Sequence, residues 1–454
     1  MVAQALNPVY SALKINSTRV NATIHESCQW GSTPDGGMNR LTANDDDRKV
    51  RDWFIATTKE YGCTHKIDAM GNIFAIRPGE NNNLPPIAIG SHLDTQPTGG
   101  RYDGILGVVS GMEVMKVLHE NNVTSYAPLA VINWTNEEGA RFPPCMLGSG
   151  VWAGQFTTEY GHARVDAAGI TLGNELERIG YIGTEACSFE TNPILAHFEV
   201  HIEQGPILDQ AELPAAVVGG VQSMRWYDMK VVGREAHTGS TPMDRRSDAL
   251  LGAAKMIVEA NRIATTGALA DRGARATIAV INSSPQSINT ISGDVQMNLD
   301  IRSPFDEDVL EIERQCREGF DKISTEHGLT LNFETIWVSP AVNFNETMKQ
   351  CVRSSALEIG CHLQLTSGAG HDAVYTSKRV PTAMIFARSR DGVSHNPAEY
   401  TRPEDCAAAA QVLLGAYLRY DDLVRQEHAA KVADASADAV AMKRAIVSQV
   451  EVES

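Results

Sequence analysis

The chain lacks the features that mark membrane, secreted and disulfide-stabilised proteins. Its eight cysteines are scattered over 454 residues without a C-x-x-C pair, which predicts free thiols in a reducing compartment. No apolar run approaches the roughly 18 residues that a membrane span requires. The N-terminal segment also lacks the continuous apolar core of a secretory signal. We therefore expect a cytoplasmic protein that does not enter a membrane.

Positive charge is scarce as well. Lys and Arg total 39 against 56 Asp and Glu, which gives a formal net charge of −17. This balance argues against nucleic acids and anionic membranes as partners, because both are bound by basic stripes. The negative net charge does not exclude an anionic small-molecule substrate, because one or two arginines at the binding site can outweigh the negative field of the whole chain locally. Glycines gather around residues 99–111, but the G-K-S/T of a phosphate loop is missing.

Length and patterning predict two domains, with one inserted into the other. At 454 residues the chain is too long for one ordinary core, and 43% hydrophobic residues suffice to bury a sizeable one. In residues 1–219 and 339–454, short apolar runs alternate with helix-like segments. This alternation is typical of an α/β sheet with helices on both faces. We expect these two segments to form one discontinuous domain.

Residues 220–338 have a different pattern. Strand, helix, strand, strand, helix and strand follow one another, with helices expected over 248–263 and 306–327. This order predicts a small inserted α+β domain with a four-stranded antiparallel sheet and two helices. The Ala-rich tail after about Glu427 is helix-prone, and its sequence suggests no role.

Four polar clusters follow expected strands of the discontinuous domain. In open α/β sheets, sites form where loops converge beyond the carboxyl ends of strands. The clusters lie at 91–95 with 99–104, at 136–142, at 201–206 and at 391–396. Each alone fits a turn or a solvated surface. Together they supply imidazoles and carboxylates in the order of a dinuclear metal site.

The ligand count predicts two metal ions that share one carboxylate. Catalytic zinc ions take three protein ligands and keep a position for water. If Asp103 bridges, one ion has His92, Asp103 and His201, and the other has Asp103, Glu138 and His395. Zinc is the first choice, and Mn²⁺ and Ni²⁺ are the alternatives. Two such ions about 3.5–4 Å apart would acidify a shared water and polarise a substrate carbonyl.

Glu137 and Glu138 are expected to have different roles. Side chains of adjacent residues in extended backbone point in opposite directions, so Glu138 can bind metal while Glu137 stays free. A free carboxylate beside the water is the expected general base, able to pass a proton to a leaving nitrogen. Asp94, two residues after His92, is expected to hold that imidazole. The alternative for Asp94 is a turn residue.

These motifs resemble the dinuclear zinc amidohydrolases related to aminoacylases and zinc carboxypeptidases. The resemblance rests on GSHLDTQPTGGRYDGILGV, NEEGARFPPCMLGSG, HIEQGPILD, AHTGSTP, DIRSP, SGAGHDA and DGVSHNPAE, which extend from residue 90 to about 400. Within that group the chain most resembles β-alanine synthases (β-ureidopropionases) and N-carbamoyl-L-amino acid hydrolases, with allantoate amidohydrolases as close relatives. The resemblance implies a zinc-aminopeptidase-like α/β catalytic domain. It also implies a homodimer in which residues 220–338 serve as lid and dimerisation domain.

The resemblance further implies contacts with the substrate. Gln204 would contact a ureido group, and Gly370 would contribute backbone contacts. His237 would stabilise the developing oxyanion, reaching the site of the partner subunit, while Asn289 and Arg302 would hold a substrate carboxylate. Structural interpretations exist for three of these side chains. Gln204 could support the neighbouring histidine, His237 could cap a turn, and Arg302 could be an exposed strand-end arginine.

The predicted reaction is hydrolysis of the ureido C–N bond of an N-carbamoyl amino acid. N-carbamoyl-β-alanine is the first choice of substrate, with β-alanine, carbon dioxide and ammonia as products. N-carbamoyl-L-α-amino acids and allantoate are the alternatives. An inactive relative that serves as a binding or scaffold protein is disfavoured by the complete ligand set. The HIEQG and DIRSP motifs disfavour a peptidase or aminoacylase.

Overall fold

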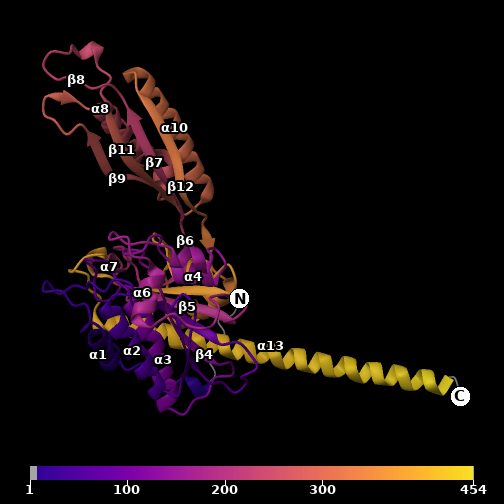
Figure 1. The fold of residues 1–454 in the computed structure, drawn as a ribbon. Coiled ribbons are helices and arrows are strands. Elements are labelled where there is room, and N and C mark those ends of the chain that lie inside the picture. The colour runs from indigo at the N-terminus through magenta and orange to yellow at the C-terminus, as the bar shows by residue number, and fades with distance from the viewer. Residues whose placement is uncertain (1–7, 453–454) are drawn as a thin grey trace. The chain divides into compact units, whose positions relative to one another are not determined.

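The chain folds into two compact units (Figure 1). The computed structural model describes residues 8–452, with side chains over residues 9–433. Unit 1 contains the residues up to Gly219, Phe344–Leu365 and the residues from Gly370 onward. Unit 2 contains Gly220–Asn343 and the short segment Thr366–Ala369. The second unit therefore begins where the sequence pattern changes and ends slightly beyond residue 338.

A mixed sheet forms the centre of unit 1. Its strand order is β1-β2-β4-β3-β5-β15-β6, with β13 and β14 also paired to β6. β4, β3, β5 and β15 are parallel and buried along their whole length, as their continuous apolar runs predict for strands covered on both faces. The strands are β1 (Thr64–Ile67), β2 (Ile73–Arg77), β3 (Ile87–His92), β4 (Leu129–Trp134), β5 (Ala196–Ile202), β6 (Ala215–Val221), β13 (Val342–Asn343), β14 (Gln364–Ser367) and β15 (Thr382–Ala387).

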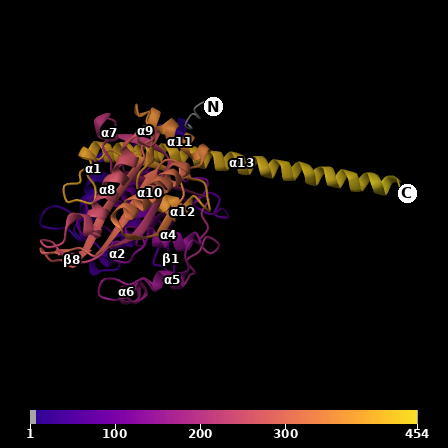
Figure 2. The same ribbon diagram turned by 90° about the horizontal axis from the view of Figure 1, so that it is seen from above.

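Helices cover both faces of this sheet. α3 packs against the face that carries Ile89 and Val131, and Trp152 of α4 packs against Trp134 on the opposite face. α3 approaches the sheet closely at Gly107, where a Cβ would lie 2.3 Å from the carbonyl oxygen of Val200. The helices are α1 (Ser17–Ser27), α2 (Asp45–Glu60), α3 (Ile105–Glu120), α4 (Leu147–Trp152), α5 (Thr158–His162), α6 (Leu172–Ile179), α7 (Ile207–Gln210), α11 (Glu346–Leu357), α12 (Asp372–Thr376) and α13 (Pro403–Val452), the long helix in Figure 2, with short 3-10 turns η1 (Pro8–Tyr10) and η3 (Arg390–Gly392).

Unit 2 is the predicted four-stranded antiparallel sheet with two main helices. The strand order is β12-β7-β11-β9, and α8 and α10 cover one face around a core that includes Met229, Met256, Met297 and Phe320. Alternation of apolar and polar residues along β11 puts its other side chains on the uncovered face. The elements are β7 (Ser223–Val232), β8 (Ala236–His237), η2 (Met243–Arg245), α8 (Ala249–Thr265), α9 (Gly267–Asp271), β9 (Arg275–Ser284), β10 (Thr290–Ile291), β11 (Asp294–Ser303), α10 (Asp306–His327) and β12 (Thr330–Ser339).

Neither a membrane helix nor a disulfide is found in the described part of the chain. Within residues 8–452 no helix is both long and apolar enough to cross a bilayer. All eight cysteines lie in residues 9–433 and none is paired, with seven buried and Cys145 partly exposed. The prediction of free thiols is therefore confirmed.

Candidate metal centre

The predicted metal ligands converge beyond the carboxyl ends of the parallel strands of unit 1. His92 ends β3, Glu138 follows β4, and His201 lies near the end of β5. Asp103 stands in the loop before α3, and His395 stands between β15 and α13. Because β3, β4, β5 and β15 run in the same direction, the loops that follow them meet at one edge of the sheet.

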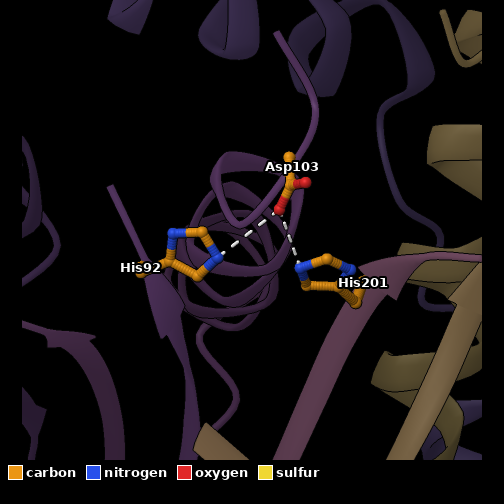
Figure 3. A group of neighbouring side chains, drawn as sticks. All are labelled: His92, Asp103 and His201. Atoms are coloured by element: carbon orange, nitrogen blue, oxygen red, sulfur yellow. Dashed lines mark ion pairs between the residues drawn. The ribbon is translucent and has the colours of Figure 1, made fainter. Parts of the chain in front are cut away.

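The carboxylate of Asp103 joins two clusters of side chains. Its Oδ1 lies 3.0 Å from His201 Nε2 and 3.5 Å from His92 Nε2, which forms the first cluster (Figure 3). Its Oδ2 lies 3.4 Å from His395 Nε2, which is 3.6 Å from Glu138 Oε2 in the second cluster. Within each cluster the ligand atoms lie within 4.8 Å of one another, so each could hold one ion. Asp103 has the arrangement of a bridging carboxylate.

Backbone carbonyls orient the two buried imidazoles of the first cluster. His92 Nδ1 lies 2.9 Å from the carbonyl oxygen of Asp94, and His201 Nδ1 lies 3.0 Å from that of Ile202. A carbonyl only accepts hydrogen bonds, so Nδ1 of each ring carries a proton and Nε2 is the atom turned toward Asp103. Within residues 9–433, the buried His92 Nε2 has no hydrogen-bond partner. A cation between these atoms would satisfy it, so the residues present fit a metal ion.

The electrostatics of the site also fit cations. Burial raises the pKa of Glu137 well above its usual value and that of Glu138 to about 7. Burial acts on the pKa of Asp103 in the same direction, but adjacent imidazoles, that of His201 foremost, hold it well below the usual range. The hydrogen bond to Asp103 raises the pKa of His395 to about 9. These shifts favour protonation of Glu138 and His395, two of the residues that could hold a cation, and metal binding is expected to release those protons.

Glu137 and Glu138 diverge at the end of β4. Asn136 has a left-handed backbone, with φ +61°, and turns the chain between the strand and the pair. Glu138 accepts hydrogen bonds from Gln96 N at 3.2 Å and from Gln96 Nε2 at 2.8 Å. Glu137 Oε2 instead lies 3.5 Å from His92 Nε2. Gln96, which sequence reasoning missed, therefore positions the glutamate of the second cluster.

Asp94 supports the site in a different way from that expected. Its carboxylate is 3.9 Å from His92 Nδ1, too far for a hydrogen bond, because the turn after β3 presents the Asp94 carbonyl to the ring instead. The carboxylate accepts hydrogen bonds from the backbone N–H groups of Glu137 and Glu138, at 3.3 and 3.2 Å. It also accepts one from Thr42 Oγ1 at 2.9 Å. The side chain of Asp94 thus orients the two glutamates.

Gln204 lies against the second cluster. Its Nε2 is 2.9 Å from Asp103 Oδ2 and 3.3 Å from His395 Nε2, and its backbone is left-handed, with φ +56°. Gly370 immediately precedes His371, a buried residue whose ring centroid lies 4.4 Å from that of His201. Sequence reasoning selected Gly370 from the SGAGHDA motif and missed His371, although the same motif contains it.

The three predicted residues of unit 2 do not lie together. His237 ends β8, and the backbone N–H of Thr238 donates to the Asn289 carbonyl at 3.0 Å, so His237 and Asn289 share one end of the unit. Arg302 lies near the other end of β11, eight residues (294 to 302) from Asp294, which is about 27 Å of strand. Strand register therefore separates Asn289 from Arg302 within one chain.

The fold and the two clusters define a hydrolase of the metal-dependent α/β type. Residues 88–419 match the sequence profile of peptidase family M20/M25/M40, and the chain belongs to this family. It is a hydrolase that acts on amide C–N bonds. The resemblance to amidohydrolases drawn from the motifs is confirmed, and so is the α/β fold class.

Individual members of the family are similar to this chain along most of its length. The chain is 39% identical to the N-carbamoyl-L-amino-acid amidohydrolase of Rhizobium meliloti over 412 residues, which cover 90% of this chain and 98% of the relative. It is 30% identical to the allantoate amidohydrolase of Bacillus subtilis, over 82% of this chain and 90% of the relative. A crystal structure of an amidase of the hydantoinase/carbamoylase family from Burkholderia multivorans is 42% identical, with a TM-score of 0.84, and covers 90% of this chain and 98% of its own.

The position of Glu137 leads to a first prediction. We expect Glu137→Gln to keep its metal and to lower kcat about 10²–10⁴-fold, because the amide cannot accept a proton. Metal content by elemental analysis and kcat for amide hydrolysis measure the two effects. Glu138→Gln is the matched control and is expected to lose metal from the second cluster. A normal kcat for Glu137→Gln would refute the role of Glu137 as base.

Proposed function

We propose that the chain hydrolyses N-carbamoyl-L-α-amino acids to the free amino acid, carbon dioxide and ammonia. The proposal is carried by the identity, along nearly the whole chain, to an enzyme named for this substrate class. The two complete clusters around Asp103 and the free Glu137 support an active hydrolase rather than an inactive scaffold protein. Allantoate is the second candidate, because an allantoate amidohydrolase is among the relatives.

N-carbamoyl-β-alanine, the first choice from sequence, becomes a competing substrate in this proposal. It differs from an N-carbamoyl-α-amino acid by one methylene between the ureido group and the carboxylate. The Rhizobium meliloti relative is named for L-amino acids, which is why the order of preference is reversed. The two substrates share the ureido group and the carboxylate, so the same residues would bind both.

Glu137 is proposed as the general base. It is 6% exposed, and burial favours its protonated form, so it can hold a proton between two steps. It would take this proton from the attacking water and give it to the departing nitrogen. When bound, two divalent cations, with zinc as the first choice, would acidify that water and polarise the substrate carbonyl. The residues that would hold them are His92, Asp103, Glu138, His201 and His395.

His237 is proposed as the donor to the developing oxyanion. Its Nδ1 accepts hydrogen bonds from the backbone N–H groups of Gly239 at 3.0 Å and Ser240 at 3.2 Å. The neutral ring therefore carries its proton on Nε2 and can donate it to an oxyanion. Gln204, with its amide nitrogen against the second cluster, would contact the ureido group, and Gly370 would add backbone contacts.

Arg302 is proposed to bind the substrate carboxylate. Asp300 accepts hydrogen bonds from Arg302 Nε at 3.0 Å and from Nη2 at 2.7 Å, while Nη1 donates to the Gly368 carbonyl at 2.8 Å. These bonds use three of the guanidinium's five N–H groups and leave one on Nη1 and one on Nη2. Asp300 thus fixes the plane of the guanidinium, and the two remaining donors suit a carboxylate.

A homodimer would allow the two ends of unit 2 to serve different active sites. β9 is an edge strand of the four-stranded sheet and exposes Val280 by 48% and Ile281 by 43%. An apolar edge strand with unpaired backbone groups is a surface that another chain can cover. We propose that unit 2 acts as lid and dimer interface. His237 and Asn289 of one subunit would then act at the metal clusters of the other.

The substrate preference is tested by comparing kcat/KM on metal-replete enzyme. The panel contains an N-carbamoyl-L-α-amino acid, its D enantiomer, N-carbamoyl-β-alanine and allantoate. We expect the L-α substrate to exceed N-carbamoyl-β-alanine about 10- to 200-fold, the discrimination that one methylene supports. A higher kcat/KM for N-carbamoyl-β-alanine or allantoate would overturn the proposed substrate while leaving the reaction type intact.

The role of Arg302 is tested by Arg302→Lys. We expect KM for carboxylate-bearing substrates to rise about tenfold or more with little change in kcat, because an ammonium cannot form the bidentate contact. Arg275, the partner of Arg302 in the register between β11 and β9, provides the matched control Arg275→Lys. If the amides of the same substrates, which carry no carboxylate, respond to Arg302→Lys as strongly as the acids, Arg302 is not the carboxylate ligand.

The shared site is tested by mixing two inactive variants, His237→Ala and Glu137→Gln. A mixed dimer would contain one site with an intact base and an intact His237. Equal mixing and free exchange are expected to restore about a quarter of the wild-type activity, since half the dimers are mixed and each has one complete site. Activity that stays at the level of the separate variants, with subunit exchange confirmed by mass spectrometry, would show that each site is self-contained.

A further inference from the structure

Glu399 is a buried carboxylate that contacts two of the loops that form the second cluster. It is 4% exposed and follows His395 in the DGVSHNPAE segment. Its Oε1 accepts hydrogen bonds from the backbone N–H groups of Tyr102 at 3.0 Å and Asp103 at 3.1 Å. Its Oε2 accepts a hydrogen bond from Ser394 Oγ at 3.0 Å. One carboxylate therefore ties the loop of the bridging aspartate to the loop of the last histidine.

The hydroxyl of Ser394 stands between two carboxylates. Its Oγ is 3.0 Å from Glu399 Oε2 and also 3.0 Å from Asp103 Oδ2, and it accepts a hydrogen bond from Gln204 Nε2 at 3.2 Å. A serine hydroxyl has one proton, so it can donate to only one of the two carboxylates at a time. Asp103 Oδ2 accepts one hydrogen bond from Gln204 Nε2 at 2.9 Å, so donation by Ser394 to Glu399 leaves the second lone pair of this oxygen free for a cation, whereas donation to Asp103 competes with that cation.

We infer that Glu399 is a positioning residue for the second cluster, which fixes the backbone of Asp103 and draws the Ser394 proton away from Asp103 Oδ2. A carboxylate suits this position because it accepts on both oxygens. Glutamine does not, because one end of its amide is a donor. If the amide nitrogen faces the N–H groups of Tyr102 and Asp103, a donor meets two donors and no hydrogen bond forms. If it faces Ser394 Oγ instead, it donates to that oxygen and turns the hydroxyl proton toward Asp103.

Glu399 reaches the backbone of Tyr102 and Asp103 through space that a side chain at position 100 would fill. A Cβ on Gly100 would lie 2.1 Å from both Cδ and Oε1 of Glu399, so only glycine at position 100 lets the carboxylate reach the two N–H groups. Gly100→Ala therefore displaces Glu399 without changing its charge, which gives an independent way to test the same contact.

The inference is tested by titrating Zn²⁺ into chelator-stripped full-length enzyme against a chromogenic chelator, with bound zinc counted by elemental analysis. We expect the wild type to bind two equivalents, and Glu399→Gln to bind the second equivalent 10- to 100-fold more weakly, the usual effect of removing an outer partner of a ligand. Glu399→Gln combined with Ser394→Ala should bind the second equivalent more tightly than Glu399→Gln alone, because no hydroxyl proton then competes at Asp103.

A matched control separates positioning from general stability. Asp421 also accepts two consecutive backbone N–H groups, those of Tyr126 at 2.7 Å and Ala127 at 2.9 Å, but these precede β4 whereas the cluster follows it. Asp421→Asn should lower the melting temperature and leave both zinc affinities unchanged. Should Glu399→Gln not accumulate as folded protein, Gly100→Ala makes the same test and should show the same selective loss.

Two results would overturn the inference. One is wild-type affinity for both zinc equivalents in Glu399→Gln or Gly100→Ala. The other is a double variant with Ser394→Ala that binds the second equivalent no better than Glu399→Gln. The measurement needs no substrate, so its outcome is independent of the substrate proposed above.

Discussion

The shared carboxylate of Asp103 is the constraint on which the rest of unit 1 depends. Its two oxygens face imidazoles from different parts of the chain, so β3, β5 and the loop after β15 must end at one edge of the sheet. α3 begins two residues later, and the positive end of its dipole favours a carboxylate there. Gly104 makes the close approach possible, since a Cβ with its φ of +68° would lie 2.3 Å from the His92 ring.

The carboxylates around Asp103 also hold the backbone of the site in place. Asp94 accepts the N–H groups of Glu137 and Glu138, and Glu399 accepts those of Tyr102 and Asp103. Two ligand-bearing loops, those of Asp103 and Glu138, are thereby each fixed by an acid that comes from another loop. This arrangement concentrates buried negative charge, which is costly unless cations or protons balance it. The folding of these loops and the binding of metal are therefore linked.

The side chains of unit 2 that are proposed to bind substrate lie far apart within one chain. His237 and Asn289 share one end of the sheet, while Arg302, oriented by Asp300, lies near the other end. A small ureido substrate spans far less than the length of β11. The separation therefore supports the proposed dimer, as does the exposed apolar edge of β9. Donors to the oxyanion and to the carboxylate would then come from different subunits.

The sequence by itself determined the α/β fold class, the pattern of unit 2 and the types of the cluster residues. Continuous apolar runs predict buried parallel strands such as Leu129–Trp134. Candidate ligands such as His92 and Glu138 lie at the ends of these runs or shortly after them. These are local signals, because the strand and the polar residue beyond it are adjacent in the chain. The separation of Glu137 from Glu138 is local as well, but it arises in the bend after β4, where Asn136 has a left-handed backbone, and not from the alternation of an extended strand.

Only the tertiary structure decided which atoms meet. The backbone carbonyl of Asp94 accepts the hydrogen bond from His92, and its carboxylate accepts those from the two glutamates. Gln96 and Glu399 make further hydrogen bonds to the site that the sequence did not predict. Apart from the contact between His92 and Asp94, these contacts join loops that are tens to hundreds of residues apart, so the spacing of residues along the chain does not predict them. Asn289 and Arg302 show the converse, because they are close in sequence and yet a straight strand carries them to opposite ends of one sheet.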